Sequence, residues 1–156
     1  MLTVGEDPRF IARRILIFAS EDIGNADPMA IVVAASAFEA VELVGMPEVQ
    51  INLAQAVIYL ASAPKSNASY MALQKAMEEI EKEPVQKIPK HLQQAGYKGA
   101  ELLDRGKDYL YPHDYDGSAI EQKYMEKKIK FYFPKEVGYE KKIKEFLENI
   151  EKLKKQ

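Results

Sequence analysis

The stretch from Gly5 to Asn67 decides the fold, and it reads GEDPRFIARRILIFASEDIGNADPMAIVVAASAFEAVELVGMPEVQINLAQAVIYLASAPKSN. Short polar motifs rich in Asp, Pro and Gly separate three long apolar segments. These segments are too apolar for ordinary surface helices, and too short and interrupted to span a membrane. Helices that are apolar on nearly every side must be covered on more than one side. The stretch therefore predicts a helical module that packs against copies of itself.

Helix start and stop signals divide this stretch. Asp7 is placed to cap a helix whose first residue is Pro8, and the pair Asp27-Pro28 repeats that signal. Glycine or proline closes each segment, and Ser66 or Asn67 can cap one more helix. The predicted helices cover 8–22, 28–44, 47–63 and 68–83. In the fourth, the apolar residues Tyr70, Leu73, Met77 and Ile80 are expected to face inward.

The rest of the chain is less regular. Residues 84–138 form an ordered connector with a short helix near 99–105 and a second after the capping box at 118–121. Residues 130–134 read Lys-Phe-Tyr-Phe-Pro and can form one short strand pair. A final amphipathic helix covers 139–156. The chain is therefore predicted to be a single all-α domain, 1–156, with a helical core over 1–83, a connector over 84–138 and a terminal helix.

Composition excludes several functions. The 156 residues are 47% hydrophobic and 29% charged, which is typical of a globular protein, and the net charge of -2 gives no overall attraction to nucleic acid. Cysteine is absent, which excludes disulfides and thiolate metal sites. The chain has no phosphate-binding Gly-x-x-x-x-Gly-Lys-Ser/Thr loop, so we expect no ATP hydrolysis, no catalytic residue and no cofactor in it. No membrane segment or signal peptide is expected.

The second and third apolar segments supply the candidate oligomer interface. Polar residues of the third segment recur every three or four positions, which places them on one stripe, and only Glu48 among them is charged. A stripe that faces water usually carries lysine and glutamate, so this one is expected to lie against something polar. The candidate interface residues are Ile31, Val32, Phe38, Asn52, Gln55 and Tyr59.

Four cations form the candidate phosphate or DNA contact: Arg9, Arg13, Arg14 and Lys65. Arginine offers a planar fork that suits phosphate, and Lys65 precedes a predicted helix N-terminus, which favours anions. In the simpler interpretation, the arginines pair with acids at helix junctions. Those acids are Glu21, Asp22, Glu39 and Glu42.

Five further residues are assigned a structural role in preference to a chemical one: Glu21, Asp22, Asp27, His113 and Asp114. Asp27 serves as a helix cap, while Glu21 and Asp22 can pair with the arginines. His113 and Asp114 are expected to hydrogen-bond the connector to the core. A metal site is not favoured, because the chain holds only two histidines. A free-standing hydrolase would require Glu21, Asp22 and His113 to meet in one pocket.

Several runs of this sequence resemble the C-terminal region of the MgsA/RarA family of replication-associated recombination ATPases and of their eukaryotic relatives, the Werner-helicase-interacting ATPases. The run 111–115 departs from the family pattern directly afterwards, at Asp116-Gly117-Ser118-Ala119. The matching runs are 5–14, 19–28, 40–47, 53–67, 111–115 and 138–143.

The resemblance implies an all-helical oligomerisation domain related to those of clamp loaders, which forms a homotetramer. It implies that ATP and Mg²⁺ are bound by an AAA+ module upstream of this chain. It also implies DNA and replication-fork proteins as partners of the full-length protein, in the bacterial cytoplasm at the nucleoid. The alternative is a DNA-binding module that uses the four cations.

Overall fold

The computed structural model describes residues 1–115 and 120–154, and within these ranges it holds helices and irregular segments but no β-strand. The all-α prediction is confirmed. Within the described part of the chain, residues 130–134 have no regular secondary structure, so the optional strand is not formed, because strand propensity alone supplies no partner edge. The predicted capping box begins at Ser118, outside the described residues, and residues 120–130 contain no helix.

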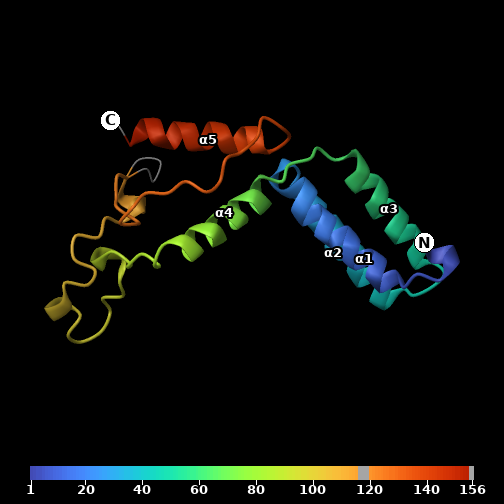
Figure 1. The fold of residues 1–156 in the computed structure, drawn as a ribbon, viewed down its shortest axis with the longest axis horizontal. Helices are drawn as coiled ribbons and strands as arrows, with labels where there is room; N and C mark the ends of the chain where they lie inside the picture. The colour runs from blue at the N-terminus through green and yellow to red at the C-terminus, as the bar shows by residue number, and fades with distance from the viewer. Residues whose placement is uncertain (116–119, 155–156) are drawn as a thin grey trace. The chain divides into compact units, whose positions relative to one another are not determined.

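The α-helices of the described residues begin close to the predicted positions (Figure 1). The Asp7 carboxylate accepts the backbone N–H of Arg9 at 2.8 Å, which caps the first helix before Pro8. That helix changes to a π-helical turn, Ala19–Ile23, where the prediction continued it as α-helix. The helices are α1 (Pro8–Phe18), α2 (Met29–Leu43), α3 (Val49–Ser62), α4 (Ala68–Lys82) and α5 (Glu140–Leu153).

Short 3-10 turns make up the remaining helical structure of the described residues. One of them replaces the short helix predicted near 99–105, and another holds His113 and Asp114. A cis peptide bond joins Met46 to Pro47 in the turn between α2 and α3. The 3-10 turns are Leu2–Val4, Gly24–Ala26, Lys90–Leu92, Glu101–Leu103 and Pro112–Asp114.

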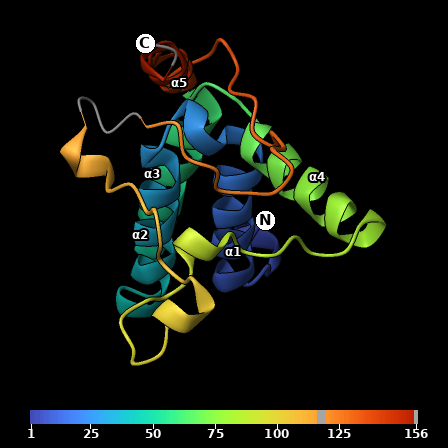
Figure 2. The same cartoon turned by 90° about the vertical axis from the view of Figure 1, so that its left-hand side faces the viewer.

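The chain divides into two compact units, one of residues 1–75 with 131–144 and one of residues 76–130 with 145–156. The first unit is built on α1, α2 and α3, which pack against one another (Figure 2). Alanine dominates the contacts between these helices, and small side chains allow the helix axes to approach closely. The buried core residues are Ala12, Ile15, Ala19, Ile23, Ala30, Ala34, Ala37, Leu53, Ala56 and Leu60.

The second unit relies on a few tethers between irregular segments. Ala100 and Ile120 are its buried apolar residues among those described. The Gln86 side chain accepts the backbone N–H of Lys127 at 2.7 Å and donates to the carbonyl of the same residue at 3.2 Å. The Lys127 ammonium also pairs with Glu83 at 3.1 Å. These polar contacts tie the segment around Lys127 to the region that follows α4.

The inward face predicted for α4 is wrong for the described residues, since its apolar side chains remain accessible. Leu73 is 62% exposed, and Tyr70, Met77 and Ile80 are exposed too. Helical periodicity predicts that one side of a helix is apolar, but it does not supply the surface that covers that side. Within the described residues, no helix is long and apolar enough to cross a lipid bilayer. The prediction of a single domain with three segments stays a prediction.

Candidate functional site

The side of α2 and α3 that faces away from the core is mostly apolar, and the exposed Glu39 lies on it too, since it is seven residues from Val32 and three from Ser36. On α2, Met29, Val32, Ser36 and Leu43 share one side by their helical spacing, and on α3, Ile51, Gln55 and Ile58 do the same. Three of these side chains are largely accessible: Leu43 at 77%, Ile51 at 71% and Ile58 at 70%. We call this surface, together with Asn52, the groove face. It is defined by Met29, Val32, Ser36, Leu43, Ile51, Asn52, Gln55 and Ile58.

A hollow of about 200 Å³ lies in the groove face, between α2 and α3. Small side chains form its floor, because Ala37 and Ala56 leave space where larger residues would meet. The polar atoms that a binding partner could contact in the hollow come from Ser36, Asn52 and Gln55. The residues that line the hollow are Val32, Val33, Ser36, Ala37, Asn52, Gln55 and Ala56.

The six candidate interface residues fall into two groups. Val32, Asn52 and Gln55 line the hollow together. Phe38 and Tyr59 are half-buried and pack against the core. Ile31 is exposed on α2, but it lies about 100° around the helix from Val32 and so points away from the hollow. The sequence reasoning missed Met29, Leu43, Ile51 and Ile58, although their spacing of three, four or seven residues from Val32, Ser36 or Gln55 indicated the same side.

Tyr59 is held inside the chain by a hydrogen bond. Its hydroxyl donates to the Asp27 carboxylate at 2.7 Å, while the other carboxylate oxygen of Asp27 accepts the N–H of Met29 at 3.0 Å. Asp27 therefore caps α2 and ties α3 to its start. The hydrogen bond to Asp27 raises the pKa of Tyr59, and burial and the Asp27 charge act in the same direction.

The four candidate phosphate contacts lie in the first unit with different surroundings. Arg9 forms an ion pair with Glu42 at 2.5 Å, which is one of the pairings considered in the simpler interpretation. The Lys65 ammonium donates to backbone carbonyls at the end of α3, including that of Leu60 at 2.8 Å. Arg13 lies over the ring of Phe10 at 5.5 Å, and Arg14 is exposed. A helix C-terminus favours a cation, so the geometry gives Lys65 a structural task.

The acidic and histidine candidates lie apart along the chain. Glu21 and Asp22 are exposed on the π-helical turn, and neither forms an ion pair with a described residue. His113 packs against the Tyr111 ring at 5.1 Å in the second unit, where Asp114 is also exposed. Among residues 1–115 and 120–154, no group of three His, Cys, Asp or Glu side chains is arranged to hold a metal ion.

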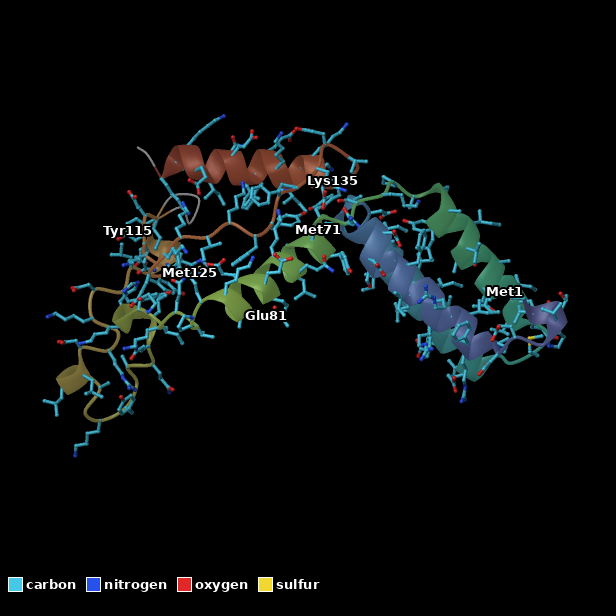
Figure 3. The ribbon with its side chains drawn as sticks, in the orientation of Figure 1. Met1, Met71, Glu81, Tyr115, Met125 and Lys135 are labelled. Atoms are coloured by element: carbon cyan, nitrogen blue, oxygen red, sulfur yellow. The ribbon has the colours of Figure 1, made fainter. Side chains whose placement is uncertain are left out.

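A buried carboxylate that the sequence reasoning missed organises another part of the first unit. Glu140 is 0% exposed and accepts hydrogen bonds from the Ser66 hydroxyl at 2.7 Å, the Tyr132 hydroxyl at 2.9 Å and the Lys135 backbone N–H at 2.7 Å. Figure 3 labels Lys135, whose ammonium donates to the Asn67 side chain at 2.7 Å. We call Asn25, Ser66, Tyr132 and Glu140 the polar cluster.

Asn25 completes the polar cluster by donating to Ser69 at 3.1 Å and to the Tyr132 hydroxyl at 3.4 Å. Burial is the main cause that raises the pKa of Tyr132; the bond from Asn25 lowers it, and the bond and charge of Glu140 raise it. These residues come from the sequence runs 19–28, 53–67 and 138–143 and the segment at 131–135. Hydrogen bonds from Ser66 to Glu140 and from Asn25 to Tyr132 join residues far apart in the sequence. The cluster therefore fastens segment 131–144 to the turn before α2 and to the segment before α4.

The sequence of this chain is similar to those of known proteins over most of its length. The family described as MgsA AAA+ ATPase C terminal matches residues 1–151. Replication-associated recombination protein A is 43% identical over 95% of this chain in Bacillus subtilis and 41% identical over 94% in Escherichia coli K12. The ATPase WRNIP1 of Dictyostelium discoideum is 40% identical over 83% of the chain. The chain spans 36%, 34% and 15% of the length of these three relatives.

Proposed function

Because this chain belongs to the C-terminal family of the MgsA AAA+ ATPases, we propose that it is the part that joins subunits, as the homotetramerisation domain of a RarA-like ATPase. One observation carries this proposal: the groove face exposes large apolar side chains on two neighbouring helices. Large exposed apolar surfaces mark interaction sites.

In the full-length protein, assembly of this domain would bring the ATPase modules together. Joining copies of this domain holds the upstream ATPase modules at a high effective concentration, and closed symmetry fixes their number. ATP and Mg²⁺ would act in those modules, and the assembled protein would act on DNA with replication-fork proteins in the bacterial cytoplasm, at the nucleoid. Support for these partners comes from the relatives named replication-associated recombination protein A.

The experiment is the solution mass of the chain, measured by light scattering coupled to size exclusion over a wide range of protein concentrations. We expect a tetramer that persists on dilution. The variant Ile58→Lys places a charge on the exposed groove face and should lower the mass, because a buried ammonium without a partner opposes association. A wild-type chain that stays monomeric at the highest concentration would contradict the proposal.

The matched control is Ile80→Lys on α4, which makes the same change at a side chain of similar exposure outside the groove face. We expect Ile80→Lys to leave the mass unchanged. The alternative function, direct DNA contact through Arg9, Arg13, Arg14 and Lys65, stays a prediction. The engagement of Arg9 by Glu42 and of Lys65 by backbone carbonyls gives it no added support.

A further inference from the structure

Four charged side chains of the first helical segment have no ion-pair partner in the fold. Arg13 and Arg14 lie on α1, and Glu21 and Asp22 lie on the π-helical turn that continues it. All four are exposed, and none of them forms an ion pair with a described residue. Arg9 of the same helix differs, because it pairs with Glu42 at 2.5 Å.

These charges are arranged symmetrically about one apolar residue. Arg13 comes four residues before Ile17, and Glu21 comes four residues after it. Residues four apart share one side of a helix, and Ile17 and Glu21 line the same hollow. Eight residues correspond to about 12 Å along a helix axis, so Arg13 and Glu21 stand at opposite ends of this side. The side therefore carries cations at one end and acids at the other.

Helix stability does not explain this order of charges. Acids stabilise a helix near its N-terminus, and cations stabilise it near its C-terminus, because of the helix dipole. Here Glu21 and Asp22 follow the last residue of α1, while Arg13 and Arg14 precede them. The acids thus lie at the end that disfavours negative charge, and a cation from outside the helix would compensate them.

The middle of this surface is apolar and hollowed. Ile17 is 38% exposed, and Leu73 of α4 beside it is 62% exposed. A hollow of about 450 Å³ lies between the two helices, which is enough space for an apolar side chain from another molecule. Its lining residues are Leu16, Ile17, Ser20, Glu21, Ser69, Tyr70 and Leu73.

Building on the proposed function, we infer that this segment packs antiparallel against the same segment of a second copy of this chain, around a twofold axis near Ile17. Arg13 then meets Glu21 of the second copy, and Glu21 meets Arg13 of the second copy, because a twofold axis makes the two pairings equivalent. Arg14 and Asp22 are exchanged in the same way.

Charge complementarity selects a second copy as the occupant. An anionic partner such as a nucleic acid would satisfy Arg13 and Arg14 but would be repelled by Glu21 and Asp22, and a cationic partner would meet the reverse problem. The occupant must carry acids and cations about 12 Å apart along a helix, on either side of an apolar residue. The segment itself has this pattern when its direction is reversed.

A second contact of this kind also fits the proposed tetramer. One twofold contact joins two subunits and then closes, so a tetramer built from twofold contacts needs two different surfaces on each subunit. The groove face would supply one of them, and the segment around Ile17 would supply the other. Disrupting the segment around Ile17 should therefore leave dimers that are held by the groove face.

The test uses the charge reversals Arg13→Glu and Glu21→Arg, first separately and then as an equimolar mixture, with light scattering and sedimentation at several concentrations. Each variant alone places like charges together twice in every contact, so the concentration at half-dissociation should rise about tenfold or more. The mixture should assemble like the wild type, because each residue at position 13 then faces an opposite charge at position 21.

Two controls make the same kind of change at exposed sites elsewhere. Lys152→Glu on α5 and Glu81→Arg on α4 should both behave as wild type, separately and mixed. Circular dichroism establishes that each variant is folded. A loss of assembly in the controls equal to that in the α1 variants would overturn the inference, because net charge and not pairing would then govern association.

The outcomes separate this inference from the function on which it rests. A wild-type chain that assembles, with Arg13→Glu and Glu21→Arg assembling identically to it, would overturn the contact and leave the proposed function standing. Variants that dissociate separately and stay dissociated when mixed would overturn the antiparallel pairing. A wild-type chain that stays monomeric would overturn both proposals. Dissociation of each variant with recovery on mixing would establish the contact.

Discussion

The polar cluster and the groove face lie in the same unit and invert the usual distribution of polar and apolar groups. In the polar cluster, a carboxylate is fully buried and each donor around it is satisfied within the chain. On the groove face, large apolar residues are exposed and two amides have no partner among the described residues. A buried polar group with all its hydrogen bonds serves folding. Large exposed apolar surfaces are typical of interaction sites, which is the basis of the proposed assembly.

This contrast separates the stability of the fold from the proposed assembly of the protein. Changes to the polar cluster should lower the free energy of unfolding, since they leave buried donors or acceptors unpaired. Changes to the groove face should alter the solution mass and leave the folded chain intact. The following substitutions test the interactions inside the folded chain, by their effect on the free energy of unfolding.

Gly138→Ala should have the largest effect. Gly138 has φ +52°, and a Cβ atom there would lie 2.0 Å from the Ala26 carbonyl oxygen, which accepts the N–H of Tyr139 at 2.8 Å. Left-handed strain of about 1–2 kcal/mol adds to displacement of that hydrogen bond, worth about 1 kcal/mol. We expect urea unfolding to show a loss of about 3 kcal/mol or more once the clash is included.

Gly45→Ala is the control for that substitution. Gly45 also has a positive φ, +73°, but no atom beyond its two chain neighbours lies within 4 Å of the Cβ position. It should show only the backbone strain. Equal losses in the two variants would mean that the close approach of Gly138 to Ala26 is unimportant.

Glu140→Gln should have the next largest effect. The amide keeps the shape but replaces one acceptor oxygen with a donor, which must then face donors from Ser66, Tyr132 or Lys135. We expect the free energy of unfolding to fall by about 1–3 kcal/mol, as for other unsatisfied buried groups. Glu145→Gln on the exposed side of the same helix should change it little. A Glu140→Gln variant as stable as wild type would show that the cluster does not fasten segment 131–144.

Tyr59→Phe should have the smallest effect, with a distinctive pH dependence. The bond to Asp27 raises the folded-state pKa of Tyr59 above its usual value near 10. The stabilising contribution is therefore fully present below about pH 10 and is lost as pH rises through the raised pKa. The difference between wild type and variant in urea unfolding should be constant up to about pH 9 and shrink above about pH 10. A difference that stays constant across this range would contradict the role of the Asp27 bond.

Local signals in the sequence were sufficient for much of the fold. The Asp7-Pro8 and Asp27-Pro28 pairs marked helix starts, because caps act through neighbouring atoms that any chain with that sequence brings together. The three long apolar segments between helix start and stop signals indicated helices, and α1, α2 and α3 form the core. Val32 was predicted as an interface residue from the apolar side of its segment, and Asn52 and Gln55 from the spacing of a polar stripe with little charge; the three line the hollow together.

The polar cluster could not be predicted in this way. Glu140 lies in a segment rich in lysine and glutamate, where every acid has the same local pattern, and only the approach of Ser66 and Tyr132 distinguishes it. The prediction that the apolar side of α4 is covered was wrong, and the reason is related. Periodicity predicts which side of a helix is apolar, but not what lies opposite.

The sequence by itself determined where helices start, which sides are apolar, and which family the chain resembles, because these depend on neighbouring residues and their order. The tertiary structure alone decided that Glu140 is buried, that Gly138 lies against Ala26, and that Tyr59 is bonded internally while Asn52 and Gln55 have no partner among the described residues. Those facts depend on distances between segments far apart in the chain. Such distances result from the packing of the whole unit and from no local pattern.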